Sequence, residues 1–265
     1  MKKSVYLIIL AVVTILCIIA GSSYNLRHAA KGMHKAGNAV RKSFSKDYRD
    51  YNDSADFDDD YEDLFDDDFD DDFEDRTQAF DSEELEKFDT LAVDGSVLAI
   101  EIERGNSYSI SSKYNSKMLK PEYSLHNGRL YITQKKARRH LTVGNHKCRV
   151  KVTVPYGVTL DKLDIDVDVG AVQLNGFDVN KASVSTDVGA IQITNLDFSD
   201  MSVQSDVGAV SIELMEPVDN YNINASSDIG AIELNGDNVR HRYSSKGTNG
   251  KYLRIRTDVG GIEIK

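Results

Sequence analysis

Five aspartates begin five copies of one pentapeptide, Asp-(Val/Ile)-Gly-(Ala/Gly)-(Val/Ile): Asp168, Asp187, Asp206, Asp228 and Asp258. If the copies stack in register at a strand spacing of ~4.8 Å, neighbouring carboxylates repel by roughly 1 kcal/mol in water. Two interpretations of what offsets this repulsion stay open. Each Asp can accept a backbone N–H of its own turn, or the row can bind calcium. The glycine-rich nonapeptide of calcium-binding β-rolls is missing, so calcium is the weaker hypothesis.

Other residues with metal or catalytic chemistry are sparse. His140, His146 and Cys148 lie closest together and could in principle bind zinc, but one Cys and two His at these spacings are not a recognised set. The sequence has no Gly-x-Ser-x-Gly elbow, phosphate loop or His-Glu-x-x-His motif. A repeated Asp also argues for structure, because an active site is normally singular. We therefore predict no enzyme and no cofactor, with a glycan-active β-helix as the enzymatic alternative.

The repeats themselves predict the fold. They start 19, 19, 22 and 30 residues apart, which is typical of a solenoid. Because the apolar alternation changes phase at each glycine, every coil should be two short strands joined at a corner. The predicted corner residues are Gly170, Gly189, Gly208, Gly230 and Gly260. The same alternation places one further residue per coil on the inward face: Val169, Val188, Val207, Ile229 and Val259.

Upstream of the repeats the pattern is also strand and turn. Strands are expected near residues 97–102, 108–110, 123–125, 130–132 and 148–154, with Asn127-Gly128 as a hairpin signal. These strands should cap one end of the solenoid, and the irregular insertion at 238–251 is a candidate cap for the other end. The fold class is therefore all-β, a β-solenoid over residues 88–265. Cys148 should be buried in a strand, and with Cys17 it gives no disulfide framework.

The Asn-Gly-x-Leu-x-Ile hairpin, the strand ending at Val154-Pro155 and the Asp-Val-Gly-Ala-Ile coils resemble the putative-adhesin β-strand repeat family of bacterial surface proteins. The resemblance covers roughly residues 88–265. It implies an extracytoplasmic β domain, similar to domains of membrane-anchored proteins linked to cell-envelope stress. It transfers no catalytic motif.

The first 46 residues predict membrane attachment. Residues 1–21 contain an apolar run from Val5 to Ala20, which reads as a signal-anchor helix or as the core of a cleaved signal peptide. Residues 22–46 carry six bases and no acid, among apolar residues at near-helical spacing. They indicate either an amphipathic helix on anionic lipid or a basic tether. Six bases after the apolar run favour a cytoplasmic β domain, whereas the Lys-Lys start resembles an export signal.

Residues 47–87 predict a disordered acidic linker, because Phe-Asp repeats such as Phe65-Asp66-Asp67-Asp68 cannot bury a core. The linker should act as a spacer, or alternatively bind a cationic peptide. Net charge is +8 over residues 1–46, −19 over 47–89 and zero over 90–265. The β domain is therefore not a gross-charge binder.

One basic stretch interrupts this neutral domain: Lys135, Lys136, Arg138, Arg139, Lys147, Arg149 and Lys151. It is either a solvated face or a contact for an anionic polymer or for the acidic linker. Nucleic acid is disfavoured, because the stretch lacks interleaved aromatic residues for base stacking.

Taken together, the sequence predicts a non-enzymatic, single-pass cell-membrane protein with an extracytoplasmic β domain, used in adhesion or envelope-stress sensing. Residues 5–46 would contact membrane lipid, and a cell-wall polymer, cationic peptide or protein is the candidate partner. The structural alternative is a scaffold that self-associates through the solenoid ends.

Overall fold

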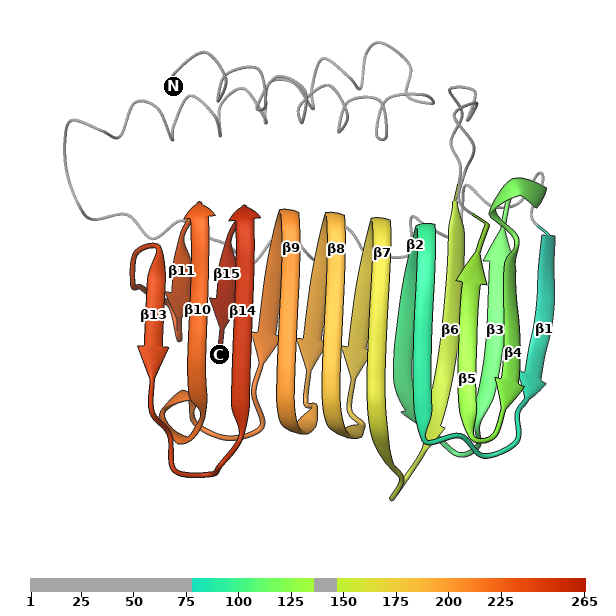
Figure 1. Cartoon of the computed structure of the whole chain (residues 1–265), viewed down its shortest axis with the longest axis horizontal. Coiled ribbons are helices and arrows are strands. Elements are labelled where there is room, and N and C mark those ends of the chain that lie inside the picture. Colours follow the sequence, from blue (N-terminus) through green and yellow to red (C-terminus); the bar gives the residue numbers. More distant parts are fainter. Residues whose placement is uncertain (1–77, 136–146) are drawn as a thin grey trace, which may run out of the picture. The chain divides into compact units, whose positions relative to one another are not determined.

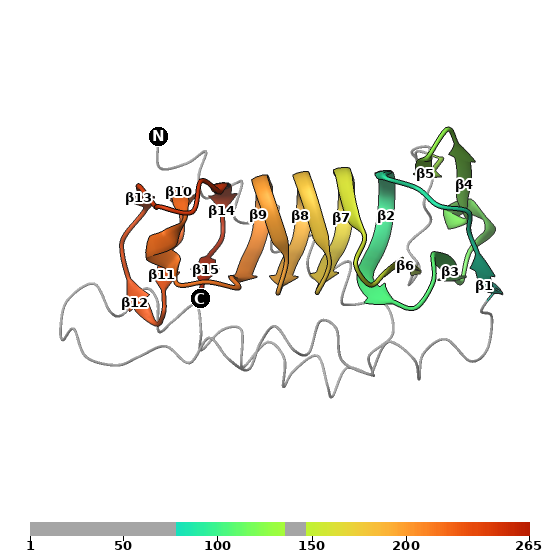
Figure 2. The same cartoon turned by 90° about the horizontal axis from the view of Figure 1, so that it is seen from below.

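The computed structural model describes residues 78–135 and 147–265. They form one 15-stranded sheet that folds back on itself, so that its two halves face each other as layers (Figures 1 and 2). This part of the chain contains no α-helix, only two short 3-10 turns, η3 (Lys117–Leu119) and η4 (Val218–Asn220). The all-β, solenoid-like class predicted from the repeats is confirmed.

Three coils form the regular centre of the stack. They are β7 (Thr159–Asn175), β8 (Asp178–Thr194) and β9 (Asp197–Glu213). The strands are parallel and in repeat register, so that Gly170 is opposite Gly189 and Gly189 opposite Gly208. Each coil is one continuous strand bent at its glycine, rather than the two separate strands predicted. Backbone pairing to the neighbouring coils therefore continues through the bend.

The other two repeats do break at the corner, but they do not stack in sequence order. The fourth copy forms β10 (Asn222–Ile229) and β11 (Ile232–Leu234), and the fifth forms β14 (Tyr252–Val259) and β15 (Ile262–Ile264). β14 pairs with β9 on one side and with β10 on the other (Figure 1). The fifth coil thus lies between the third and the fourth.

A sixth coil, which the repeat search missed, begins the stack. β2 (Thr90–Gly105) runs parallel to β7 in one register from Thr90 to Glu103, with Leu98 opposite Gly170. Its corner reads Ser96-Val97-Leu98-Ala99-Ile100, which does not match the pentapeptide because Ser96 replaces the Asp and Leu98 replaces the glycine. The pentapeptide therefore did not predict this coil, although the apolar alternation predicted a strand over residues 97–102.

Both ends of the stack are closed by antiparallel strands. At one end β12 (Asp237–Asn238) pairs with β11, and β13 (Arg242–Ser245) pairs with β10. The insertion predicted as a cap does cap the stack, but it covers the fourth coil. Because β14 occupies the inner edge of the fourth coil, the fifth is an internal coil.

At the other end β2 is shared by two strands, β5 (Arg129–Gln134) on its first half and β6 (Cys148–Pro155) on its second. Antiparallel strands follow on each: β4 (Pro121–His126), β3 (Ser109–Tyr114) and β1 (Gln78–Glu84). β4 and β5 are joined at Asn127 and Gly128, both with positive φ, as the hairpin signal predicted. β1 lies inside the segment 47–87 expected to be linker.

The corner of β2 has no neighbouring coil on its outer side, and Gln134 takes the place of one. β5 pairs with β2 only as far as Asp94, and β6 pairs with it only from Ala99. Between these points the Gln134 side chain accepts the backbone N–H groups of Ser96 and Val97 at 3.1 and 3.0 Å. Its amide group donates to the Leu119 carbonyl at 2.7 Å. A buried glutamine therefore satisfies the polar groups that the end of the stack would otherwise leave unpaired.

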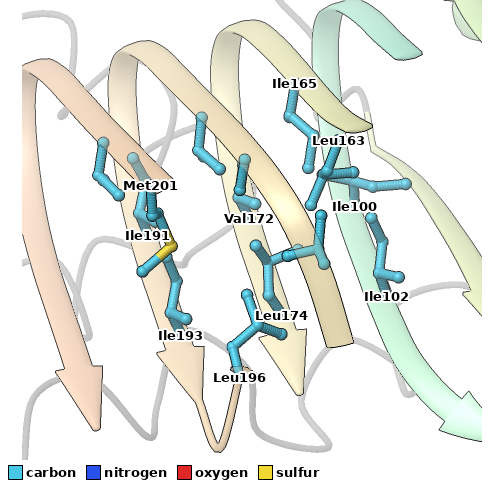
Figure 3. Packing of buried hydrophobic residues seen from close by; sticks show 14 of the residues in the cluster. Ile100, Ile102, Leu163, Ile165, Val172, Leu174, Ile191, Ile193, Leu196 and Met201 are labelled. Carbon is cyan, nitrogen blue, oxygen red and sulfur yellow. The ribbon is translucent and has the colours of Figure 1, made fainter. Parts of the chain in front are cut away.

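The core is a row of apolar side chains between the two layers. Figure 3 shows the first-half residues, such as Leu163 and Ile165, beside second-half residues of the coils, such as Val172 and Leu174. The same columns recur in every coil and are almost fully buried. The apolar alternation therefore identified the core correctly in both halves of the coil.

The prediction was wrong for one residue in each coil. Val169, Val188, Val207 and Val259 are only half-buried, and Ile229 is 48% exposed. Inward alternation ends two residues earlier, at a position that holds Val167 in β7 and buried hydroxyl residues in the other four repeats: Thr186, Ser205, Thr257 and Ser227. The backbone begins to bend there, so the next apolar residue lies on the outer edge of the corner.

The buried hydroxyls bind the polar groups of the corner. Thr186 donates to Ser205 at 3.2 Å, between two neighbouring coils. Thr257 and Ser227 donate to the Gly260 carbonyl at 3.3 and 2.9 Å. These hydrogen bonds compensate for burying polar groups beside the bend.

The corner glycines are required because successive coils touch there. A Cβ on Gly189 would overlap the carbonyl of Gly170, and one on Gly208 would overlap the carbonyl of Gly189. The series continues with Gly260 against Gly208 and Gly230 against Gly260, which reproduces the exchanged coil order. Leu98 is tolerated in β2 because its own outer side faces Gln134 rather than another corner.

We predict that Gly208→Ala destabilises the fold by more than about 3 kcal/mol, since the methyl group can fit only if two coils separate. Gly157→Ala is the matched control. Gly157 also has a positive φ, but nothing lies within 4 Å of the point that its Cβ would occupy, so the expected cost is about 1–2 kcal/mol. Urea unfolding followed by circular dichroism measures both. Equal losses would contradict the proposed coil contact.

Candidate functional site

The repeated aspartates form a row on the outer side of the corner, in coil order Asp168, Asp187, Asp206, Asp258 and Asp228. Arg256 donates to Asp258 at 3.1 Å and forms an ion pair with Asp228 at 3.5 Å. Hydrogen bonds to Asp258, together with the charges of Asp258 and Asp228, raise the pKa of Arg256. One arginine thus offsets the repulsion between carboxylates at the last coils.

The expectation that each Asp accepts a backbone N–H of its own turn is wrong for four of them. Among the hydrogen bonds of residues 78–135 and 147–265, those of Asp206 and Asp258 involve the side chains of Gln204 and Arg256. No backbone amide there donates to Asp168 or Asp228. Asp187 does have a contact of its own. The row is therefore held by neighbouring side chains more than by its own turns.

Calcium remains a hypothesis for this row. In the described ranges, no three His, Cys, Asp or Glu side chains are grouped so that they could hold a metal ion. With Arg256 already among the carboxylates, we expect the melting temperature to be the same in millimolar calcium and in chelator. A rise of several degrees in calcium would instead support the cation site.

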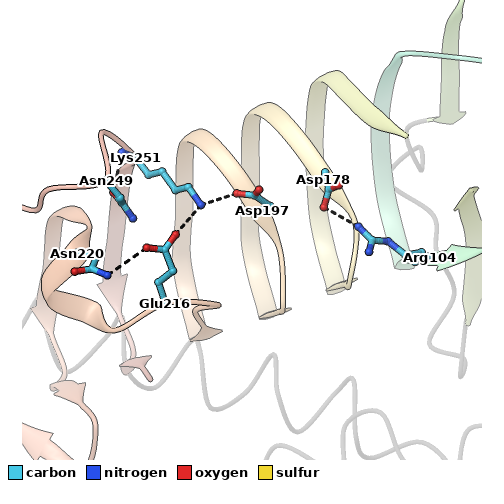
Figure 4. Close-up of polar contacts among 7 residues, drawn as sticks. All are labelled: Arg104, Asp178, Asp197, Glu216, Asn220, Asn249 and Lys251. Atoms are coloured by element: carbon cyan, nitrogen blue, oxygen red, sulfur yellow. Dashed lines mark hydrogen bonds and ion pairs between the residues drawn. The ribbon is translucent and has the colours of Figure 1, made fainter. Parts of the chain in front are cut away.

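A second set of polar contacts lies near the turns that connect one coil to the next, where β8 and β9 begin (Figure 4). Arg104 bridges to Asp178 at 2.6 Å, and Lys251 bridges to Asp197 at 2.7 Å and to Glu216 at 3.1 Å. Burial opposes the charge on Lys251, but its hydrogen bonds to Asp197 and Glu216 outweigh burial and raise its pKa. Two carboxylates therefore engage the Lys251 ammonium group. The network ties the insertion to the third coil.

A larger polar surface lies on the outer face of the layer that the first halves of the coils form. It extends over the first half of β9, over β14 and over β10. Because the three strands are parallel and in register, their outward residues form rows across the sheet. We call these nine residues the polar patch: Asp200, Ser202 and Gln204 from β9; Tyr252, Arg254 and Arg256 from β14; Asn222, Asn224 and Ser226 from β10. The aspartate row of the corner lies beyond its far end.

A shallow, open groove lies within the polar patch, and Tyr252 lies outside its lining. Its volume is ≈ 160 Å³, and it is lined by short Ser and Asn side chains around Arg254 and Arg256. Arg254 donates to Asp200 at 2.6 Å, across the two neighbouring strands β14 and β9. Tyr252 is 53% exposed. The arrangement offers hydrogen-bond donors, acceptors and an aromatic surface together, with no covalent chemistry among them.

Sequence reasoning did not find the polar patch. Its three strands come from the third, fifth and fourth copies, and only the exchange of coils brings β14 between the other two. The available signal was that Arg254 and Arg256 replace the Asp and Ser of the earlier copies at equivalent positions, Asp164, Asp166, Ser183 and Ser185.

Comparison with known proteins agrees with this architecture. The family model described as Toastrack DUF4097 matches residues 88–245, more than half of the chain. The chain belongs to the Toastrack DUF4097 family. This agrees with the resemblance to putative-adhesin β-repeat proteins noted from the sequence.

Two solved structures are similar to the Toastrack domain of this chain. A putative cell adhesion protein from Clostridium sporogenes ATCC 15579 is similar over 71% of this chain and 99% of its own, at 19% identity and a TM-score of 0.56. A putative adhesin from Bacteroides fragilis NCTC 9343 is similar over 73% of this chain and 99% of its own, at 11% identity and a TM-score of 0.33. None of the curated proteins matches this chain.

The zinc candidates and the basic stretch predicted from the sequence lie partly in residues 136–146, which the structure does not describe. His140, His146, Lys136, Arg138 and Arg139 lie outside them. Within the basic stretch, Lys135 pairs with Glu122 at 2.7 Å, and Lys151 pairs with Glu101 at 3.2 Å and Glu103 at 2.9 Å. Lys147 and Arg149 also have contacts. The stretch is therefore at least partly neutralised by the domain's own acids.

Membrane attachment also falls outside the described residues, because the apolar run Val5 to Ala20 and the segments 22–46 and 47–77 precede them. Within 78–135 and 147–265, no helix is long and apolar enough to span a membrane.

Cys148 of the Toastrack domain should be chemically inert. It is 3% exposed, and burial raises the pKa of its thiol to about 12, although a hydrogen bond with Gln134 partly opposes this. In a Cys17→Ser variant at pH 8, we expect no reaction with a thiol reagent until the protein is unfolded, because the thiolate is the reactive form. Rapid reaction of the native protein, or retention of stoichiometric zinc after dialysis, would contradict this expectation.

Proposed function

We propose that this chain is a non-enzymatic, single-pass membrane protein that displays its Toastrack domain outside the cytoplasm and binds other molecules through the outer faces of the stack. The observation that carries the proposal is the in-register stacking of six coils. It fixes the outward side chains in rows at the strand spacing of ~4.8 Å. A rigid surface of this kind loses little conformational entropy on binding.

Adhesion is the function we favour for this surface. The Clostridium sporogenes protein of similar fold is described as a putative cell adhesion protein. At 19% identity the likeness supports the fold alone, so adhesion enters here as a proposal. Envelope-stress sensing, which the sequence resemblance implies, needs the same extracytoplasmic binding surface.

The N-terminal segments would supply attachment and reach. Residues 5–46 combine an apolar run with six following bases, which suits insertion into lipid and contact with anionic headgroups. Residues 47–77 would hold the Toastrack domain away from the membrane, since like charges extend a chain. In this arrangement a cell-wall polymer or a protein of another surface is within reach.

Protease treatment of intact cells tests the location. With an epitope tag at the C-terminus of the full chain, we expect external protease to remove the tag while a cytoplasmic marker stays intact. Binding is then measured with intact bacterial cells as the target of the purified full chain in detergent micelles, with a chain lacking residues 88–265 as the control. The full chain should bind, and the control should not.

Two outcomes would overturn the proposal. If only lysis exposes the tag, the domain is cytoplasmic and an intracellular scaffold replaces the surface protein. If incubation with cell-wall polysaccharide releases new reducing ends over time, the glycan-active enzyme replaces the binding module.

A further inference from the structure

The geometry of the polar patch points to a ligand class, and we propose that the patch is a binding subsite for an uncharged polysaccharide. This inference rests on the proposed binding function and names its ligand. It is carried by three features of the patch: an exposed aromatic ring, arginines held in fixed positions, and nearly balanced charge.

Tyr252 supplies the aromatic surface. Along β14 the inward residues Leu253 and Ile255 are buried, whereas Tyr252 is 53% exposed on the opposite face. An exposed tyrosine offers an apolar ring and a hydroxyl group together. The C–H face of a pyranose ring is the matching surface, and the hydroxyl groups at its edge then lie over the neighbouring strands.

The two arginines supply donors in fixed places. Arg254 bonds Asp200 through Nη2, and Arg256 bonds Asp258 through Nε. A guanidinium group has five N–H donors, so each arginine keeps several for a ligand. The carboxylates fix the side chains before binding and can accept hydrogen bonds from sugar hydroxyls. A vicinal diol can therefore bond an arginine and its carboxylate at the same time.

Short polar side chains complete the groove. Ser202, Asn224 and Ser226 flank the arginines, and no side-chain hydrogen bond occupies them within the described part of the chain. The groove is ≈ 160 Å³, below the ~300–1,000 Å³ of sites that enclose a small molecule. It would therefore hold one segment of a longer chain that continues across the open sheet.

The charge of the patch argues against a polyanion. Four bases lie on or beside it: Arg254 and Arg256, Arg242 of β13 opposite Ser226, and Lys181 of β8 opposite Asp200. Four aspartates face them: Asp200, Asp206, Asp258 and Asp228. The four positive and four negative charges balance, so an anionic polymer or a nucleic acid gains little electrostatic attraction here. An uncharged ligand that both donates and accepts hydrogen bonds fits this balance best.

The patch is also local rather than a property of every coil. The outward positions of β7 and β8 equivalent to Tyr252, Arg254 and Arg256 hold no aromatic or arginine residue; they are Lys162, Asp164 and Asp166 in β7, and Lys181, Ser183 and Ser185 in β8. The exchange of coils places β14 between two strands with short side chains. Without the exchange, β14 would have only one of these strands beside it.

Binding to purified cell walls tests the subsite. The walls are treated with protease and stripped of anionic polymers by acid, and the full chain is added in detergent micelles. We expect it to bind these walls, and to lose binding after periodate, which cleaves vicinal diols. The double variant Tyr252→Ala, Arg254→Gln should bind about tenfold more weakly. The matched control is Tyr156→Ala, Lys162→Gln, which removes an exposed tyrosine and an ion-paired base elsewhere, and it should bind as the wild type does.

Each other outcome has a defined meaning. Binding that survives periodate, or equal binding by both double variants, would overturn the polysaccharide subsite. Binding to intact cells that disappears after protease treatment would identify a protein partner and leave the proposed binding function standing. Binding to neither cells nor walls would overturn both. Equal melting temperatures of the two double variants would show that the comparison reports binding rather than folding.

Discussion

The contact between each corner glycine and the carbonyl group of the preceding coil in the stack is the constraint on which this structure depends. It lets neighbouring coils approach to hydrogen-bonding distance through the bend, where any Cβ would hold them apart. Continuous pairing through the bend then aligns every column of side chains. The apolar columns become the core, the hydroxyl column forms hydrogen bonds beside the corner, and the outward columns become a regular surface. A single atom missing from one residue per coil thus fixes the register of the whole stack.

The same constraint explains why coils can exchange places. Because each coil presents the same glycine corner and the same apolar columns to its neighbours, the interface does not identify which coil comes next. The connections decide the order instead. The insertion after the fourth copy folds back onto that coil through β12 and β13, which occupies its outer edge. The fifth copy then pairs with the inner edge, beside β9. The segment between β9 and β10, with η4 and the bonded pair Glu216 and Asn220, is the longer connection that this arrangement needs.

The sequence predicted the features that depend on a few neighbouring residues, and it did not predict those that depend on the order of the coils. The pentapeptide located five of the corners, alternation located the core, and Asn127-Gly128 located a hairpin, because each signal is contained in a few neighbouring residues. The coil in β2 was missed because Leu98 replaces glycine where no further corner follows. The valines before the glycines were misplaced because period-two alternation stops where the strand begins to bend. The polar patch required knowledge of which coils are neighbours, and local pattern carries no such information.

Because the coil interfaces are interchangeable, the residues that stabilise the stack differ from those that are available to bind another molecule. The inward and corner positions must repeat, since each must fit any neighbour, whereas the outward positions contact only solvent and side chains of adjacent columns. Arg254 can therefore replace the serine or aspartate of another coil without disturbing the apolar columns on either side of it. A binding surface of this kind changes by substitution along the outer columns, or by reordering coils that are already compatible. The corner glycines can do neither, because every one of them faces a carbonyl group of the coil beside it.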